Sequence, residues 1–535
     1  MSAAWLILAA IVVLLAGYIW YGRFLTRRFD VDPLRITPSH TKEDGVDYVP
    51  AKTPVLLGHH FSSIAGAGPI LGPIYAAIFG WIPVFLWILI GSIFVGGVHD
   101  FSSVIASIRH GGKTIGEVIE EHIGRSGKKL FLIFVWSVLI LVVAVFAKSV
   151  ASIFVKEPAT ATSSFLFIFL AIIFGLGVYR LNTPLWLSSV IGVGLLLACV
   201  AVGVYFPIHR SYNFWIFILF IYVYIAAITP VWILLQPRDY LNSFLLFIVL
   251  LAGVLGIFVA NPKISFPAIT HFNTNLGSLF PILFVTVACG AISGFHSLVS
   301  AGTTAKQLDN ERDAKPVTYG GMLIEAVLAV VALITAVTIL QGDYLRLLSK
   351  EGGGPIGIFS NGIGTFVSHL GVPMHLGITF AALAISAFAL TSLDTATRLA
   401  RFAFQEFFDD GKNSLLSQNR YIGTLITVIA AALMALSGTS DTLWPLFGSA
   451  NQLLASVVLL AITVWLADIR VKNRFVKYPM YFMFLITLTA LGSLVYKNVK
   501  AANIPLVIFS LLLFIVAVIL IIQAGKRLKQ LKSAQ

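Results

Sequence analysis

The sequence predicts an all-α polytopic membrane protein of about 15 transmembrane helices, with inverted repeats and broken helices. Of its 535 residues, 58% are hydrophobic and only 11% are charged, whereas a soluble domain is about a quarter charged. The apolar residues form successive runs close to the ~20 residues that cross a bilayer. Glycines and histidines interrupt two of these runs, which is typical of helices broken at a transport site.

The apolar runs predict fifteen spans in one membrane domain. If the N-terminus is outside, most lysines and arginines fall on the cytoplasmic side, as membrane topology requires, and the C-terminus is cytoplasmic. Topology and anionic headgroups therefore explain the net charge of +13, so the expected partner is the lipid bilayer and not nucleic acid. The spans lie near 3–21, 55–79, 82–108, 130–155, 163–181, 184–206, 213–235, 242–260, 280–303, 319–341, 375–406, 420–437, 447–467, 478–496 and 503–523.

The spans group into segments without a separate soluble domain. The two longest outer connections, 261–279 and 342–374, contain glycine and proline and are expected to be loops or short re-entrant pieces. The segments are an N-terminal extra transmembrane helix within 1–30, a first inverted repeat at 52–260, a second at 275–523 and a basic cytoplasmic tail at 524–535.

The polar run at 58–69, in the second span, does not belong in lipid. Unpaired backbone groups are costly in hydrocarbon, so this run predicts a broken helix that lines a cavity. Aligning its Gly58-x-His60 with Gly294-x-His296 in the ninth span also superposes Gly66 on Gly302. Spans seven apart cross in opposite directions, as inverted repeats require. Small residues are common in membrane helices, so a chance match is the alternative.

The two polar runs supply the candidate substrate-binding residues. A neutral imidazole can donate a hydrogen bond to a carboxylate or relay a proton, and of the adjacent pair His59 and His60 the repeat favours His60. A histidine bonded only to a neighbouring helix is the alternative reading. The candidates are His59, His60, Ser62, Ser63, Gly66, Gly68, Gly290, Ser293, Gly294, His296 and Ser297.

Ionisable residues at membrane depth are costly and usually face a cavity or a partner. His99 and Asp100 close the third span and are gate candidates, although a polar helix end would look the same. Lys148 and Glu325 lie within spans and are ion-coupling candidates. The alternatives are that Lys148 snorkels to the interface and that Glu325 is exposed at a helix end.

The eleventh span ends in a run of hydroxyls around one acid. Thr391, Ser392 and Asp394 could supply oxygen ligands to a proton or a hard cation, so they are further ion-coupling candidates. An internal pair between Asp394 and Arg398, spaced i, i+4, is the alternative.

Signatures of soluble enzymes are absent or weak in this sequence. It has no P-loop lysine motif, no metal-type cysteine spacing and no Gly-x-Ser-x-Gly elbow in an α/β context. No enzyme activity and no cofactor are therefore expected. A metal-binding protein or intramembrane metalloenzyme that uses His59, His60 and His296, or His60, His296 and Asp394, is the weaker alternative.

Several long blocks carry a resemblance to a known family. They are Gly58-His59-His60-Phe61 through Gly72-Pro73, Gly97 to Phe101, Pro230-Val231-Trp232 with Pro237 to Leu241, Ala288 to Thr304, Thr391 to Arg398, Leu443 to Gly448, and Asn451 to Ala455. From about residue 52 to 470 the sequence resembles the carbon starvation protein A family of bacterial inner-membrane transporters.

The resemblance implies secondary-active uptake of peptides, or for some members of pyruvate with protons, under nutrient stress. It also implies the amino acid–polyamine–organocation superfamily, with either a leucine-transporter-like or a seven-plus-seven inverted repeat. In the leucine-transporter reading, Thr391 and Ser392 fall where hydroxyls meet a sodium site beside the first broken helix. We therefore expect a transporter coupled to H⁺, or alternatively to Na⁺, while the oligomeric state stays open.

Overall fold

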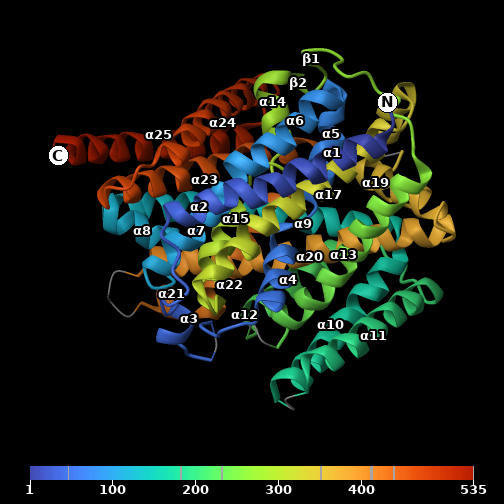
Figure 1. The fold of residues 1–535 in the computed structure, drawn as a ribbon, viewed down its shortest axis with the longest axis horizontal. Helices are drawn as coiled ribbons and strands as arrows, with labels where there is room; N and C mark the ends of the chain where they lie inside the picture. The colour runs from blue at the N-terminus through green and yellow to red at the C-terminus, as the bar shows by residue number, and fades with distance from the viewer. Residues whose placement is uncertain are drawn as a thin grey trace.

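The computed structural model describes residues 1–45, 47–180, 183–230, 233–349, 352–409, 414–437 and 440–533. These residues form a bundle of helices (Figure 1), and the sheet found among them is one antiparallel pair of two-residue strands, β1 (Asn273–Thr274) and β2 (Gly277–Ser278). The predicted all-α membrane class is confirmed.

Eleven helices in the described part of the chain are long and apolar enough to cross a membrane, or twelve with the bent pair α4 and α5. The first half contains α1 (Ala3–Ala16), α2 (Gly22–Arg28), α3 (Pro38–Thr41), α4 (Thr53–Ile64), α5 (Gly68–Ala76), α6 (Trp81–Gly91), α7 (Gly97–Arg109), α8 (Ile115–His122), α9 (Arg125–Lys156), α10 (Pro158–Arg180), α11 (Leu185–Tyr205), α12 (Tyr212–Ile228) and α13 (Leu235–Ala260).

The second half begins with a helix that is interrupted for several residues. It contains α14 (Leu279–Thr286), α15 (Gly294–Val299), α16 (Ala305–Gln307), α17 (Gly321–Val337), α18 (Gln341–Leu348), α19 (Gly354–Ser368), α20 (Met374–Phe407), α21 (Leu415–Gln418), α22 (Arg420–Ser437), α23 (Ser440–Asp468), α24 (Arg474–Lys500) and α25 (Ile504–Ser533). Short π-helical turns continue several of these, including Ser300–Thr304 after α15 and Lys315–Gly320 before α17.

The predicted count of fifteen spans is not confirmed. Helices α12 and α22 stand where the predicted spans 213–235 and 420–437 lie, but their apolar stretches are shorter than a full crossing. The predicted span 280–303 is divided between α14 and α15 by a non-helical stretch. The end of the predicted span 163–181, residues 231–232 and the last two residues of the basic tail lie outside the described residues.

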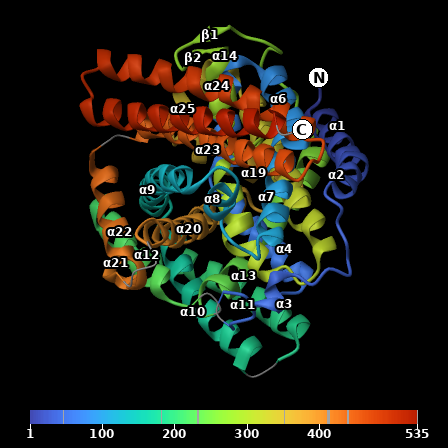
Figure 2. The same ribbon diagram turned by 90° about the vertical axis from the view of Figure 1, so that its left-hand side faces the viewer.

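Buried and lipid-exposed helices are clearly separated. Helices α9, α17 and α23 are buried along most of their length, and α9 packs against α20 (Figure 2). Helices α10 and α11 lie at one edge of the bundle, opposite α24 and α25 (Figures 1 and 2). Peripheral helices expose large apolar side chains such as Trp20, Trp186 and Ile508. Such surfaces suit hydrocarbon and not water.

The outer connection 342–374 is more ordered than a loop. Apart from residues 350–351, which lie outside the described residues, it contains all of α18 but its first residue and all of α19. Helix α19 packs against α20, α13 and α17, and a Cβ on Gly377 would stand 3.0 Å from the Cα of Gly364. Close glycine contacts of this kind let a short helix dock on a longer one.

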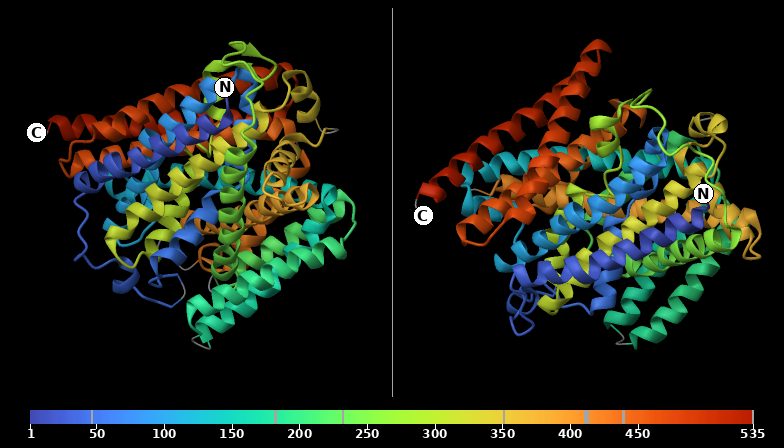
Figure 3. Two further views of the ribbon diagram at one scale, coloured as in Figure 1. Left: turned by 45° about the vertical axis from the view of Figure 1, so that its right-hand side comes forward. Right: turned by 45° about the horizontal axis from the view of Figure 1, so that its top comes forward.

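The two ends of the chain lie at opposite ends of the bundle (Figures 1 and 3). Because the long helices run in that direction, this arrangement agrees with termini on opposite faces of the membrane. Which face is cytoplasmic remains a prediction.

Candidate functional site

The two broken helices meet in the interior of the bundle. Helices α4 and α5 are bent by 45° at residues 65–67, and residues 287–293 separate α14 from α15. Helix α4 contacts α15, and α5 contacts α14, so the two broken segments run antiparallel. A Cβ on Gly68 would lie 2.4 Å from the Sγ of Cys289. Only glycine therefore fits where the two breaks touch.

A second close approach fixes the start of α15 against α23. A Cβ on Gly294 would lie 2.2 Å from the carbonyl oxygen of Asn451. The Asn451 side chain accepts a hydrogen bond from the backbone N–H of Phe295 at 2.9 Å and donates one to Ser293 Oγ at 2.9 Å. Asn451 thus satisfies polar groups that the break leaves without helical partners.

Four titratable side chains form a buried row, which we call the Asp100 cluster. The carboxylate of Asp100 accepts hydrogen bonds from Nδ1 of His99 at 2.8 Å and from Nδ1 of His296 at 2.9 Å. The other nitrogen of His296 lies 3.3 Å from a carboxylate oxygen of Glu325. All four side chains are fully buried. The predicted gate, relay and coupling residues of α7, α15 and α17 therefore come together.

A second buried group, the Arg238 cluster, joins α12, α13 and α20. The guanidinium of Arg238 donates to Asp394 and, at 3.1 Å, to Asp239. The hydroxyl of Tyr222 donates to Asp394 at 2.6 Å, and Thr391 Oγ1 accepts from Arg238 at 3.3 Å. One fully buried cation thus faces two buried carboxylates.

The first broken helix contacts the Arg238 cluster directly. Nδ1 of His59 lies 3.1 Å from Asp239, and Ser62 Oγ donates to the carbonyl of Asp239 at 2.9 Å. Ser392 Oγ donates to the carbonyl of Ser63 at 3.2 Å. The hydroxyls of α20 therefore lie beside the end of α4, as the leucine-transporter reading implies.

His60 points the other way from His59. Its Nδ1 lies 2.8 Å from Thr304 Oγ1, and its ring packs on Gly321 at the start of α17. The Nε2 atoms of His59, His60 and His99 are buried without a hydrogen-bond partner within the described residues. Each of these nitrogens retains a lone pair or a proton for a ligand.

The remaining candidates of the two breaks have packing contacts. A Cβ on Gly66 would lie 2.7 Å from Ser392 Oγ, and one on Gly290 would lie 2.6 Å from Ala329. Ser297 Oγ donates to the carbonyl of its own helix at Gly294. These residues shape the breaks, and their role toward substrate stays a prediction.

Two alternatives from the sequence are corrected. Arg398 donates to the carbonyls of Ala226 and Thr229, whereas Asp394 is paired with Arg238, so the i, i+4 pair of Asp394 and Arg398 does not form. Glu325 is fully buried and not exposed at a helix end.

Lys148 binds the end of a helix, and the suggested metal ligands do not form one group. Lys148 Nζ donates to the carbonyl of Ala435 at 3.0 Å, in the last turns of α22, where a cation suits the helix C-terminus. Among the described residues, His60, His296 and Asp394 do not converge as one ligand group. His296 belongs to the Asp100 cluster and Asp394 to the Arg238 cluster.

Arg238 was not predicted as a site residue, although it lies in the distinctive block Pro237 to Leu241. It follows Pro237 and precedes Asp239 near an apolar run, so it resembled a basic residue at a span end. The side chain is 1% exposed. A buried arginine is expensive without partners, and here the carboxylates of Asp239 and Asp394 compensate it. The block Pro237 to Leu241 had already contributed to the family resemblance.

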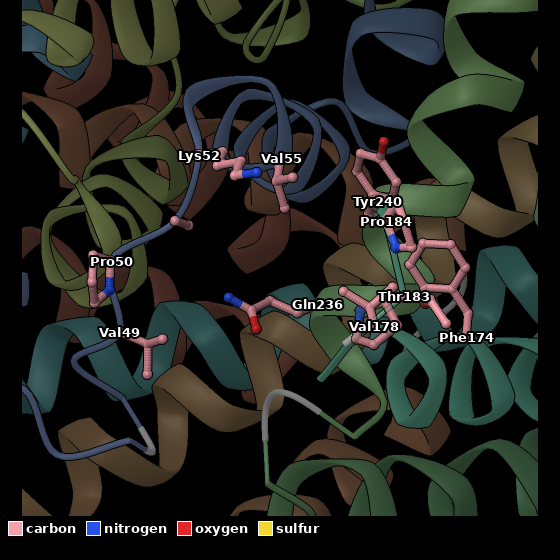
Figure 4. A pocket seen from close by; sticks show the side chains of 12 residues that line it. Val49, Pro50, Lys52, Val55, Phe174, Val178, Thr183, Pro184, Gln236 and Tyr240 are labelled. Atoms are coloured by element: carbon pink, nitrogen blue, oxygen red, sulfur yellow. The ribbon is translucent and has the colours of Figure 1, made fainter. Parts of the chain in front are cut away.

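A pocket of about 400 Å³ lies between the start of α4 and the start of α13 (Figure 4). Lys52 and Val55 from the start of α4 line one side, and Tyr240 and Phe174 line the other. Gln236 reaches into it, and its amide donates to Gln307 at 2.6 Å. Val55, which lines the pocket, stands four residues before His59 on α4, about 6 Å along the helix axis and on the same face.

Comparison with known proteins identifies the family. The family model described as "Carbon starvation protein CstA" matches residues 2–352 and 347–490. The chain belongs to the CstA family.

Named CstA relatives match nearly the whole chain. A peptide transporter CstA of Bacillus subtilis is 33% identical and covers 99% of this chain and 98% of its own length. The pyruvate/proton symporter BtsT of Escherichia coli is 32% identical and covers 92% of this chain and 81% of its own. Family membership confirms the predicted resemblance, and with it a nutrient transporter of the carbon starvation type and not an enzyme.

A solved structure shares the fold of this chain. The manganese transporter of Eremococcus coleocola is 11% identical, with a TM-score of 0.54, and the match covers 91% of this chain and 99% of that one. At this identity the likeness concerns the fold alone.

Proposed function

We propose that this member of the CstA family imports small nutrients that carry a carboxylate, peptides or pyruvate, by alternating access coupled to H⁺. The names of its relatives support both substrate classes, and the symporter among them supports proton coupling. The bacterial inner membrane is the proposed location, with the N-terminus outside and the C-terminus cytoplasmic.

The observation that carries proton coupling is the Asp100 cluster. Hydrogen bonds join His99, Asp100 and His296, Glu325 lies 3.3 Å from His296, and among the described residues no lysine or arginine forms an ion pair with these four side chains. Ionisable rows inside membrane proteins commonly serve as proton relays. Glu325 is the proposed proton carrier because both its oxygens lack a hydrogen bond among the described residues.

The Arg238 cluster supports H⁺ over Na⁺. Asp394, Thr391 and Ser392 could offer oxygens to a sodium ion, but Arg238 already supplies the positive charge beside Asp394. A second cation at the same carboxylate would meet electrostatic repulsion. Na⁺ coupling at Thr391, Ser392 and Asp394 is therefore the second candidate.

The substrate carboxylate is proposed to bind between the two breaks. Helices α5 and α15 both begin there, so their positive dipole ends face the same region. The Nε2 atom of His60 has no hydrogen-bond partner among the described residues and can donate to the substrate when it carries the proton, whereas Nε2 of His59 can donate only as the imidazolium because Asp239 accepts from Nδ1. The pocket at Gln236 is the proposed route toward one side of the membrane.

The two antiparallel breaks also support the proposed division of the chain into inverted repeats at 52–260 and 275–523, with an extra helix in 1–30. The contacts do not choose between the leucine-transporter-like and the seven-plus-seven arrangement. Both place the two breaks together in mid-membrane.

The decisive experiment is uptake into proteoliposomes that contain the full-length protein. Labelled pyruvate and labelled dipeptides are supplied separately, with an inward pH gradient, an inward Na⁺ gradient or neither. We expect accumulation of at least one substrate with the pH gradient alone. Accumulation only with Na⁺ would favour the second candidate, and no gradient-driven uptake of either class would overturn the proposal.

A further inference from the structure

A third group of titratable side chains lies outside the Asp100 and Arg238 clusters. Among the residues that the structure describes, one set of histidine, cysteine and carboxylate side chains has ligand atoms all within 4.8 Å of one another: His110, Glu121 and His122. His110 follows α7, and the other two end α8. We call this set the His110–His122 site.

The two imidazoles are held in one orientation by different acceptors. Nδ1 of His110 lies 2.6 Å from the carbonyl oxygen of Ala106, which can only accept a hydrogen bond. Nδ1 of His122 lies 2.8 Å from the carboxylate of Asp468. Both Nδ1 atoms therefore carry a proton. In the neutral state, each Nε2 is left with an unshared electron pair.

These two Nε2 atoms face each other at 3.0 Å. Two electron pairs at this distance repel unless a proton or a metal ion lies between them. Two imidazole nitrogens on a tetrahedral zinc ion, each about 2.0–2.1 Å from the metal, lie about 3.3 Å apart. A shift of a few tenths of an ångström would therefore accommodate a metal ion.

Glu121 supplies a third ligand. Its carboxylate lies 3.8 Å from Nε2 of His110, and its side chain is exposed and free to rotate toward the pair. The hydrogen bond from His122 to Asp468 is the outer support that zinc-binding histidines usually have. Trp465 packs edge-on against His110 at 5.6 Å between ring centroids and holds that ring in place.

The surroundings allow a cation to enter. A pocket of about 640 Å³ opens at His110, Glu121 and His122. Two of the arginines that also line it, Arg35 and Arg109, are engaged with the carboxylate of Glu311.

We propose that His110, His122 and Glu121 bind a divalent first-row metal ion of the Zn²⁺ type, with Asp468 as a positioning residue and water in the fourth position. The ion ties the loop after α7 to the end of α8. Asp468 belongs to α23 and also lies 3.6 Å from Arg527 of α25. Metal binding therefore stabilises one end of the bundle, away from the two breaks.

The test is zinc titration of the full-length protein in lipid nanodiscs after treatment with a chelator. Calorimetry is expected to give one Zn²⁺ per chain, and Co²⁺ is expected to give the absorption of a tetrahedral site. His110→Ala or His122→Ala should abolish stoichiometric binding. Asp468→Asn should weaken binding about 10- to 100-fold, the usual effect of losing an outer partner.

His369→Ala is the matched control. Its Nδ1 also bonds a carbonyl four residues earlier, Thr365, at 2.9 Å, but among the described residues His369 belongs to no group of three possible metal ligands. This variant should bind zinc like the wild type. Thermal unfolding of each metal-free variant checks that it still folds. Absent stoichiometric zinc, or binding that survives both His110→Ala and His122→Ala, would overturn the proposal and leave a shared proton between the rings.

Discussion

Arg238 and Asp394 are separated by 156 residues in the chain, yet their side chains form an ion pair with only 1% and 0% exposure. The pair links α13 to α20, and Tyr222 of α12 adds a third helix through its hydrogen bond to Asp394. Three helices of the interior are thus joined by one desolvated charge pair.

Breaking this pair from either side should destabilise the protein strongly. Arg238→Gln leaves Asp394 buried without its cation, and Asp394→Asn leaves Arg238 with one carboxylate fewer. Losing one partner of a buried pair costs about 3–5 kcal/mol. Unfolding in detergent should show a large decrease in the free energy of unfolding for each of these two variants. Arg346→Gln, which removes an exposed pair with Asp343, should change that free energy little. Equal stability of all three variants would mean that the pair is not desolvated.

Glu325→Gln should uncouple transport from the pH gradient. The amide keeps the size of the side chain but cannot exchange a proton with His296, 3.3 Å away. Concentrative uptake in proteoliposomes should disappear, while exchange of labelled for unlabelled substrate continues. Glu43→Gln, at an exposed side chain between α3 and α4, is the matched control and should keep concentrative uptake. Full concentrative uptake by Glu325→Gln would assign the proton to another residue.

Gly68→Ala should impair folding or transport because its methyl group would meet Cys289 Sγ at 2.4 Å. The control is Gly194→Ala in α11, where an added Cβ meets nothing within 4 Å. Adding Cys289→Gly to Gly68→Ala should restore part of the loss by removing the clashing side chain. Yield of folded protein by size-exclusion chromatography and uptake rates measure both effects. An unaffected Gly68→Ala variant would show that the two breaks separate easily.

Glu117 on α8 gives a pH-dependent contribution to stability. Burial alone would raise the pKa of its carboxyl, but hydrogen bonds and charge from Lys128 and Lys113 outweigh burial and hold the pKa below the usual 4.5. A lowered folded-state pKa contributes stability above about pH 4.5, and the contribution is lost as pH falls through the folded pKa. The difference in unfolding temperature between wild type and Glu117→Gln should therefore shrink below that pH. A constant difference across the titration would contradict this.

The membrane class and the position of the two breaks could be predicted because their signals are local. Hydropathy marks helices, and glycine, proline and histidine in an apolar run mark a break. The pairing of His60 with His296 placed both segments in one region, where Gly68 does contact Cys289.

What the sequence could not supply depends on contacts between distant segments. In the sequence, Arg238 resembles a basic residue that sets membrane topology. Its partner Asp394 comes close only because α20 packs against α13, which the sequence does not show. Arg398 is spaced suitably along the chain to pair with Asp394, yet it donates its hydrogen bond to a backbone carbonyl of α12 instead. Helix α19 was read as a loop or re-entrant piece since its glycines suit close packing and breaks alike.

The contact between Gly68 and Cys289 also places a native thiol where chemical labelling can report on the two breaks. The chain has two cysteines, and the other, Cys199, lies in peripheral α11. In a Cys199→Ser background, a thiol reagent can reach only the sulfur that is wedged between the two broken helices. The rate of Cys289 labelling therefore reports how often the two broken segments separate. A substrate that holds the segments together will slow the labelling.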